Sequence, residues 1–379
     1  MIYIVLNNSP FYQGGVEQVV ANLLVTFDKK LTKSIILICS DDSKPKEFKY
    51  QGYKCVNLIT NKHKIFDVIL LKSQLLYSYK IFNYLKNRVK EQDMINIHGI
   101  EYAFFPSLLK KLFKNKVTIL VTCHGSYFDR YQRYINNLPK KFFIHKILIK
   151  FWKYYYFLIE SLIIKNVDKF IFITNYLADF YKNTYKIKSN YVTIPNGLKE
   201  VDNFSERVNK DIDTALIIGS SYYLKGLDIA IEAVRIINNE GKQLTLRIVG
   251  FKDIKLKKEP FIKYVGSVVP TKIHEEFNKS NFLLLPSRDE SFPMVVLESI
   301  SNKKPILISK EAAKAKINYS SVGKVIQGYS IDKWVKGIRQ LMDSKNYERY
   351  SKSLSTINID NFKLNNVGNA YLSVFKSYI

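Results

Sequence analysis

The amino-acid sequence predicts an α/β fold of two doubly wound domains, each with a parallel sheet. Three observations lead to this prediction. The chain has 379 residues, which is too long for one ordinary hydrophobic core. Short runs rich in Ile, Val, Leu and Phe alternate with longer helical stretches, as in parallel sheets whose strands are buried on both faces. A polar stretch over 198–214 interrupts this pattern, which then begins again.

Apolar runs in each half are the expected strands. In the first half they are IYIVLN (2–7), SIILICS (34–40), MINIHG (94–99), VTILVTCHG (117–125), KFIFITN (169–175) and YVTIPNG (191–197). In the second half they are ALIIGSS (215–221), LTLRIVG (244–250), IKYVGS (262–267), NFLLLPS (281–287), KPILISK (304–310) and GKVIQG (323–328). In such sheets ligands bind beyond the carboxyl ends of the strands, so we expect the site in the crevice between the two domains.

The charge of the chain favours an anionic partner. It carries 59 Lys and Arg against 33 Asp and Glu, a formal net charge of +26, and residues 1–200 are the more basic half. Such a field attracts nucleic acid or an acidic membrane surface, although a compositional bias from an AT-rich gene would look similar. Three scattered cysteines and an N-terminus without signal-peptide features lead us to expect a cytoplasmic protein.

Two glycine motifs follow expected strands. Gly14 and Gly15 in QGGVEQVVANLL close a strand-to-helix loop, where backbone N–H groups could approach an anion or the residues could simply form a tight turn. Gly219 ends a strand in GSSYYLKGLDIAIEAV, and Lys225 stands just before the following helix, where it could pair with a diphosphate. Each motif alone is weak evidence, because a tight turn or a solvated lysine has the same sequence.

The segment PSRDESFPMVVLES (286–299) combines a strand end, a loop and a helix that is expected to begin near Phe292. Glu290 would lie in the loop and Glu298 about two turns into the helix, so both carboxylates can face the crevice and accept hydrogen bonds from sugar hydroxyls. The free N–H groups at the helix start can hold a phosphate. The apolar residues expected to face the core are Val295, Val296 and Ile300.

Two histidines stand at the ends of expected strands, His98 in IHGI and His124 in TCHGS. A histidine at the carboxyl end of a strand is well placed for chemistry, but a purely structural role stays open for both, and more so for His98. No cluster of His, Cys and carboxylates has the spacing of metal ligands, so we expect no bound metal.

The basic segment, residues 106–165, holds twelve Lys and Arg against two acidic residues. Its apolar run is interrupted at Lys146, Lys150, Lys153 and Glu160, so it does not qualify as a membrane-spanning helix. A long basic helix with aromatic residues is suited to lie in a membrane interface, and the alternative is a helix buried in the first domain. No nucleic-acid-binding motif accompanies the charge, so nucleic acid is not an expected partner.

The order of these motifs resembles that of the glycosyltransferases of family 4, which are retaining enzymes with the GT-B fold. The shared features are Gly-Gly-x-Glu after the first strand, His-Gly after a mid-domain strand, IPNG at the domain junction, Gly-x5-Lys-Gly at the start of the second domain, and Glu-x-Phe-Pro-x4-Glu late in the chain. The likeness spans about residues 1–310, and LKGLDIAIEAV and DESFPMVVLES are its most specific parts.

The resemblance implies two Rossmann-like domains that face a central cleft. Residues 1–199 would form the acceptor-side domain and residues 200–359 the nucleotide-sugar-binding domain. A C-terminal helix at about 360–379 would pack back onto the first domain.

The resemblance also implies roles for single residues. Lys225, with Gly219, would bind the donor diphosphate, Glu290 the hydroxyls of the transferred sugar, and Glu298 the ribose. The remaining implied residues are Gly15 near the phosphates, the backbone N–H groups of the segment Ser291, Phe292 and Pro293 (proline itself having none), and His124 at the transferred sugar. One position departs from the family, which usually has an arginine after the glycine: here it is Ser220, so diphosphate neutralisation depends more on Lys225.

The implied function is transfer of a sugar, with UDP as the expected nucleotide, to a lipid-linked saccharide in bacterial polysaccharide, O-antigen or lipopolysaccharide assembly. No cofactor and no metal is implied, and the basic first domain would hold the protein at the inner face of the cell membrane. Two alternatives stay open: a nucleotide-sugar 2-epimerase of the same fold, and a non-catalytic partner protein. Intact Lys225, Glu290 and Glu298 argue against the second.

Overall fold

The computed structural model describes residues 1–12, 14–59, 72–137, 143–188, 190–199, 212–251 and 258–378. They form two compact units. Unit 1 comprises Met1–Gly197 and the C-terminal Leu364–Ile379, and unit 2 comprises Leu198–Lys363. Most of the predicted polar stretch (200–211) and the centre of the basic segment (138–142) lie outside the described residues.

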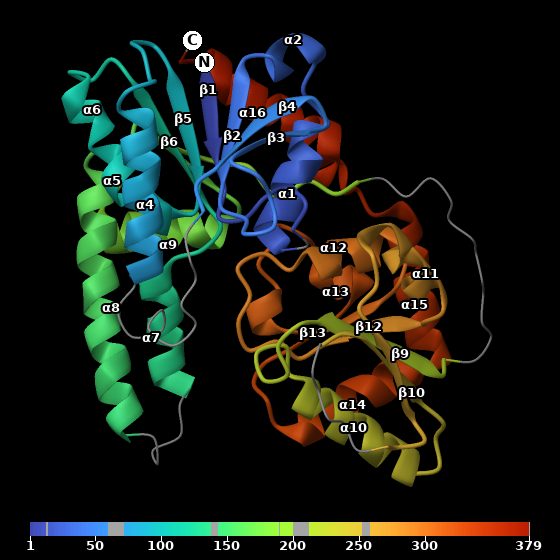
Figure 1. Ribbon diagram of the computed structural model, residues 1–379. Helices are drawn as coiled ribbons and strands as arrows, with labels where there is room; N and C mark the ends of the chain where they lie inside the picture. Colours follow the sequence, from blue (N-terminus) through green and yellow to red (C-terminus); the bar gives the residue numbers. More distant parts are fainter. Residues whose placement is uncertain are drawn as a thin grey trace. The chain divides into compact units, whose positions relative to one another are not determined.

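Unit 1 has an eight-stranded sheet in the order β3-β4-β2-β1-β5-β6-β7-β8 among its described residues (Figure 1). The strands are β1 (Ile2–Val5), β2 (Ile35–Cys39), β3 (Glu47–Tyr50), β4 (Tyr53–Asn57), β5 (Met94–His98), β6 (Thr118–Cys123), β7 (Lys169–Phe172) and β8 (Tyr191–Thr193). All strands predicted for the first half are confirmed. The sequence missed β3 and β4, which form an antiparallel pair at one edge of an otherwise parallel sheet.

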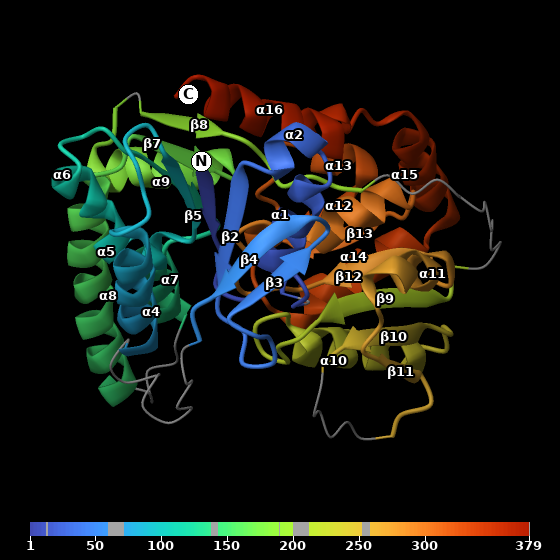
Figure 2. The ribbon, with the colours of Figure 1, turned by 45° about the horizontal axis from the view of Figure 1, so that its top comes forward.

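Helices cover the sheet of unit 1 on both faces. They are α1 (Gly15–Leu24), α2 (Lys29–Thr32), α4 (Lys72–Leu85), α5 (Phe104–Ser107), α6 (Leu109–Leu112), α7 (Tyr127–Asn137), α8 (Phe143–Ile164), α9 (Asn175–Tyr185) and α16 (Leu364–Lys376), with a 3-10 turn η1 (Ile100–Tyr102). Helices α1 and α16 share one core with the sheet, in which Leu23 and Phe375 are almost fully buried. Helices α4, α5 and α8 lie side by side (Figure 2). The C-terminal helix is therefore part of unit 1.

Unit 2 has a six-stranded parallel sheet in the order β11-β10-β9-β12-β13-β14 among its described residues. The strands are β9 (Thr214–Gly219), β10 (Thr245–Gly250), β11 (Ile262–Gly266), β12 (Phe282–Leu285), β13 (Ile306–Ser309) and β14 (Gly323–Ile326). The helices are α10 (Leu227–Asn239), α11 (Ile273–Asn278), α12 (Met294–Ser301), α13 (Tyr319–Val322), α14 (Ile331–Met342) and α15 (Ser344–Thr356), with 3-10 turns η3 (Pro270–Lys272), η4 (Lys310–Ala312) and η5 (Asp360–Phe362). All strands predicted for the second half are confirmed.

Successive residues of the unit 2 strands enter opposite cores, as strand geometry requires. In β9, Ala215 and Ile217 join one core with helices α10 and α14. Leu216, between them, joins the other core, which contains residues of α11, α12 and α15. Burial on both faces explains why these strands read as continuous apolar runs in the sequence. Strands β9 and β12 pair with each other in parallel, so the loops after them meet at one edge of the sheet.

Candidate active site

Two glycines shape the loop from β9 to α10 at the carboxyl edge of the unit 2 sheet. A Cβ atom on Gly219 would lie 2.6 Å from Cγ of Lys225, so the missing side chain lets the lysine cross the end of β9. Gly226 has a φ of 69°, and a Cβ there would lie 2.1 Å from the carbonyl oxygen of Pro286. The Lys225-Gly226 motif thus holds the lysine at the point where β9 and β12 end.

Lys225 makes an ion pair with Glu290. Its Nζ donates to Oε1 of Glu290, and Oγ of Ser287 lies 3.0 Å from the same oxygen. The Glu290 side chain is 9% exposed and that of Lys225 is 23% exposed. A carboxylate this buried needs a partner, and the lysine supplies it. Two of the predicted site residues are therefore in direct contact.

Arg288 anchors the loop after β12. Its guanidinium donates to both carboxylate oxygens of Asp228, at 2.8 and 2.7 Å, and its Cζ lies 4.0 Å from the ring centroid of Tyr223. Its backbone N–H donates to the carbonyl oxygen of Leu224 at 2.7 Å. These contacts tie the loop that carries Glu290 to the loop that carries Lys225. The sequence did not predict them, because nothing in the spacing of the residues pairs 288 with 228.

Helix α12 begins at Met294, two residues later than the predicted start at Phe292. Proline disfavours the helical conformation of the residue before it, and this excludes Phe292 from the helix. Pro293 is the N-cap residue, with φ −78° and ψ 95°. The ring of Phe292 is buried instead, with its centroid 6.3 Å from that of Phe362. The predicted core side of the helix is confirmed, because Val295, Val296 and Ile300 are all buried.

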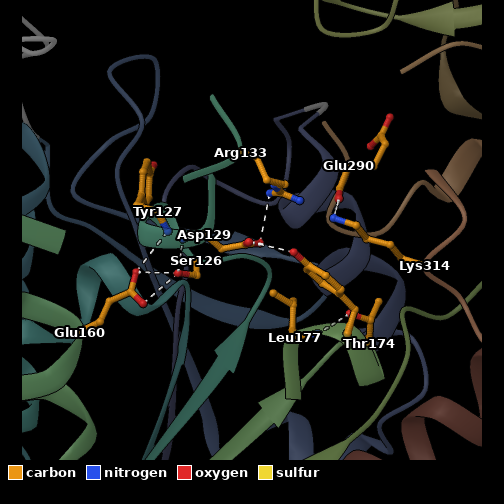
Figure 3. Close-up of polar contacts among 10 residues, drawn as sticks. Ser126, Tyr127, Asp129, Arg133, Glu160, Thr174, Leu177, Glu290 and Lys314 are labelled. Carbon is orange, nitrogen blue, oxygen red and sulfur yellow. Dashed lines mark hydrogen bonds and ion pairs between the residues drawn. The ribbon is translucent and has the colours of Figure 1, made fainter. Parts of the chain in front are cut away.

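The start of α12 offers unpaired donors. Among the described residues, none accepts a hydrogen bond from the backbone N–H groups of Ser291, Phe292 or Met294. The ammonium of Lys314, in the loop after β13, donates to the carbonyl oxygen of Glu290 just before them (Figure 3). Free N–H groups, the positive end of a helix dipole and nearby lysines are together suited to an anion such as a phosphate. Lys314 was not predicted from the sequence.

Glu298 lies one helical turn further along α12, on a different side of the helix from the core residues Val295, Val296 and Ile300. Its side chain is half-buried, and burial raises its pKa to about 7. No side chain or backbone N–H among the described residues donates a hydrogen bond to this carboxylate. Within the described part of the chain it is therefore an acceptor without a donor, which suits a ligand that brings its own hydroxyl groups.

The glycine pair of unit 1 serves mainly for packing. A Cβ on Gly14 would lie 2.2 Å from Oε2 of Glu17, a buried carboxylate that accepts from Nδ2 of Asn8 at 2.8 Å. Gly15 is the first residue of α1, and none of the described atoms lies within 4 Å of a Cβ built on it. The close approach of the Glu17 carboxylate to the backbone therefore requires Gly14. The phosphate role of Gly15 stays a prediction.

His98 and His124 are in direct contact at the carboxyl edge of the unit 1 sheet. His98 is the last residue of β5 and is buried, and His124 follows β6 and is half-buried. Nδ1 of His98 lies 3.0 Å from Nε2 of His124, and the rings stack with centroids 5.3 Å apart. Burial lowers the pKa of both, that of His124 to about 4, so both rings are neutral at pH 7.

Glu160 is a second buried carboxylate in unit 1, placed by α8 beneath the start of α7 (Figure 3). The hydroxyls of Tyr181 and Tyr185 donate to its Oε2 at 3.0 and 2.9 Å. Ser126 Oγ and the Tyr127 backbone N–H donate to its Oε1 at 3.2 Å each. From the sequence, Glu160 was interpreted only as a break in an apolar run. A lone acidic residue in such a helix could have indicated a buried polar contact.

Unit 1 should become less stable as the charge on Glu160 develops. Burial raises the pKa of this carboxyl to about 7. Between its unfolded value of about 4.3 and pH 7 the folded chain binds more protons than the unfolded chain, so stability falls as pH rises. We expect Glu160→Gln to be more stable relative to wild type at pH 8 than at pH 5, by about 2.5 kcal/mol. Urea unfolding at both pH values measures this.

Glu160→Gln must be compared with the wild type at each pH, because other titrating groups change the stability of the chain in the opposite direction. The lowered pKa values of His98 and His124 mean that the unfolded chain binds more protons in mildly acid solution, so their contribution to stability grows as pH rises. Both histidines are unchanged in Glu160→Gln. An equal stability difference at pH 5 and pH 8 would contradict the assignment of Glu160.

One face of α8 exposes a row of apolar side chains, which we call the α8 surface. Phe151, Tyr154, Leu158 and Leu162 are 64%, 62%, 61% and 50% exposed. Their spacing places them on one side of the helix, and the exposed Lys150 and Lys165 stand at the two ends of the same side. None of the helices in the described parts of the chain has the length and apolarity to span a bilayer.

Two protein-family models match the chain, one over each unit. The model described as Glycosyltransferase Family 4 matches residues 13–200, and the model described as Glycosyl transferases group 1 matches residues 199–354. An uncharacterized glycosyltransferase of Methanocaldococcus jannaschii is 27% identical over 84% of this chain and 80% of its own length. An uncharacterized 41.2 kDa protein in the cps region of Klebsiella pneumoniae is 23% identical over 97% of both chains.

Solved structures share the fold over nearly the whole chain. Sucrose-phosphate synthase from Thermosynechococcus elongatus superposes with a TM-score of 0.75 at 13% identity, covering 99% of this chain and 98% of that one. The lipopolysaccharide outer core galactosyltransferase WaaB gives 0.65 at 16% identity, covering 98% and 99%. Anabaena HepE, solved in complex with UDP and glucose, gives 0.71 at 13% identity, covering 99% of both chains.

Proposed function

This chain belongs to the glycosyltransferases of family 4 and has the GT-B fold, and we propose that it moves a sugar from a nucleoside diphosphate sugar to a lipid-linked saccharide with retention of configuration. The observation that carries the proposal is the carboxyl edge of the unit 2 sheet. There the Lys225–Glu290 pair, the free N–H groups at the start of α12 and the carboxylate of Glu298 come from neighbouring loops.

The proposed chemistry follows from where charge develops. Breaking the sugar–phosphate bond leaves positive charge on the sugar ring and negative charge on the departing diphosphate. Lys225 and the N–H groups of Ser291 and Phe292 would stabilise the diphosphate, and this requires no metal ion. Glu290 would accept hydrogen bonds from the sugar hydroxyls, and Glu298 from the ribose. We assign no residue as a nucleophile.

The nucleotide, the acceptor and the cellular pathway are finer parts of the proposal. UDP is favoured because a structure of the same fold, that of HepE, holds UDP and glucose. A saccharide acceptor in bacterial polysaccharide or lipopolysaccharide assembly is favoured by the likeness to WaaB and to a protein encoded in a cps region. We propose that the reaction takes place at the cytoplasmic face of the membrane.

Two measurements test this function. A thermal-shift screen of nucleotide sugars is expected to raise the melting temperature with one nucleoside diphosphate sugar above all others, because a ligand of the native state stabilises it. Nucleoside diphosphate should then be released only when a saccharide acceptor is added. Release without an acceptor, with formation of an epimerised sugar, would favour the 2-epimerase, and no stabilisation by any nucleotide sugar would favour a non-catalytic partner protein.

The α8 surface is the proposed contact with an anionic membrane. Exposed aromatic and aliphatic side chains between two lysines suit the boundary between head groups and acyl chains, and the basic charge adds attraction to acidic lipids. We expect the chain to sediment with phosphatidylglycerol-containing vesicles at low salt and much less with phosphatidylcholine vesicles. The double variant Tyr154→Glu/Leu158→Glu should lose most of this binding.

A control separates this surface from the general charge of the protein. Lys263 is exposed on β11 of unit 2, so the variant Lys263→Glu makes the same change in net charge as the double variant, but in the other unit. It should sediment as the wild type does. Equal loss in both variants, or equal binding of the wild type to both kinds of vesicle, would contradict the proposed contact.

A further inference from the structure

The histidine pair of unit 1 is the end of a longer chain of hydrogen bonds that begins at Thr122 on β6. The ring of Tyr371, on α16, stacks on that of His98, with the ring centroids 6.4 Å apart. Oγ1 of Thr122 donates to Oδ1 of Asn96 at 3.0 Å, and Nδ2 of Asn96 lies 3.3 Å from Nε2 of His98. His98 Nδ1 then lies 3.0 Å from Nε2 of His124. All of these side chains are buried except the half-buried ring of His124.

The chemistry of these groups gives the chain one direction from Asn96 to His124. An amide nitrogen only donates, so Nε2 of His98 must accept and carries no hydrogen. A neutral imidazole has one N–H, so the hydrogen of His98 is on Nδ1 and points at Nε2 of His124. By the same rule, the hydrogen of His124 is on its own Nδ1. Burial lowers the pKa of both rings, which keeps them neutral at pH 7.

The buried hydroxyl of Thr122 fixes which way the amide of Asn96 points. Its hydrogen is donated to Oδ1 of Asn96, which leaves Nδ2 of the amide facing His98. With the amide reversed, Nδ2 would face Thr122, and the hydroxyl hydrogen of Thr122 would lose this acceptor. An unpaired buried hydroxyl is costly, so the observed order is favoured.

We propose that His98, held by Asn96, is a positioning residue that fixes His124 as the Nδ1–H tautomer, so that His124 presents a hydrogen-bond donor and not a base. Among the described residues, none accepts a hydrogen bond from Nδ1 of His124. The inference rests on the proposed function only in naming the group that receives this bond, a hydroxyl oxygen of the transferred sugar. His124 then orients the sugar and does not deprotonate the acceptor.

The tautomers can be observed directly. Long-range ¹H–¹⁵N correlation spectra of the full chain labelled with ¹⁵N-histidine distinguish protonated from unprotonated ring nitrogens. At pH 7 we expect Nδ1 of both His98 and His124 to be protonated and Nε2 of both to be unprotonated. The signals are assigned by their loss in His98→Phe and His124→Phe. A protonated Nε2 on His124, whether in the neutral ring or in an imidazolium, would overturn the proposal.

The His98→Phe variant tests positioning, because it keeps an aromatic ring but removes the N–H. We expect His124 to become a mixture of tautomers and kcat/KM for the donor to fall about tenfold, the value of one neutral hydrogen bond. His274→Phe, on α11 of unit 2, is the control, and it should leave the tautomer of His124 and kcat/KM for the donor unchanged. A single Nδ1–H tautomer of His124 in His98→Phe would refute the positioning role.

These outcomes are separate from those that test the proposed function. If the spectra show the expected tautomers but His124→Phe transfers sugar at the wild-type rate, the sugar contact of His124 is wrong while the fixed tautomer stands. If no nucleotide sugar is used by the wild type, the proposed function fails and the spectra still decide the tautomer.

Discussion

A Lys225→Met variant is expected to transfer sugar about 10²–10³ times more slowly than the wild type. The lysine is the cation fixed beside Glu290 at the carboxyl edge of the unit 2 sheet, where the departing diphosphate would develop its charge. Loss of one preorganised group that stabilises a developing anion typically lowers kcat by this factor. The measurement is the rate of nucleoside diphosphate release with saturating donor and acceptor.

Two further variants make the Lys225 result specific. Lys263→Met removes an exposed lysine of β11 and should leave the rate unchanged. Ser220→Arg, combined with Lys225→Met, should recover part of the rate, because position 220 follows Gly219 and is where related enzymes carry an arginine. A wild-type rate in Lys225→Met, with an unchanged melting temperature, would remove the lysine from the site.

The second large effect is expected for Glu298→Ala, in the affinity for the donor. The carboxylate has no donor among the described residues, and the ribose would supply two hydroxyls. Hydrogen bonds to a charged acceptor contribute about 1.5–3 kcal/mol each, so the loss of even one of them should raise Kd about tenfold to a hundredfold. Titration calorimetry with the nucleoside diphosphate measures this change in Kd. The ligand lacks the transferred sugar, so it isolates the contact of Glu298 with the ribose.

The pH dependence of the same titration gives an independent check. Burial raises the pKa of Glu298 to about 7, so most of the carboxyl is protonated at pH 6, and hydroxyl donors bind the ionised form better. Affinity should therefore increase from pH 6 to pH 8 in the wild type, and this increase should disappear in Glu298→Ala. Glu275→Ala, on the exposed side of α11, is the control and should bind as the wild type does.

Most of the fold could be predicted because its strands are buried on both faces and read as unbroken apolar runs. The exceptions were β3 and β4. Residues of β3 alternate between half-buried and exposed, and the chain turns at Gln51 and Gly52 with positive φ values of 49° and 89°. Such a short hairpin at the edge of a sheet has too few buried residues to stand out from the loops around it.

The candidate site was predicted where local spacing carries the information. Lys225 and Glu290 lie in motifs of adjacent residues, and the structure brings their side chains together. Lys314 and Glu160 were missed because their contacts join residues 21 or more positions apart, which no sequence period reveals. The error at the start of α12 was avoidable, because the proline at 293 already disfavoured a helical residue before it.

The most direct test of the central claim is a crystal structure of the chain with the nucleoside diphosphate that the thermal-shift screen selects, UDP being the expected one. We expect the phosphates at Lys225 and at the N–H groups of Ser291 and Phe292, and the ribose hydroxyls within hydrogen-bond distance of Glu298. A nucleotide bound to unit 1, or bound to unit 2 without contact to Glu298, would contradict the account.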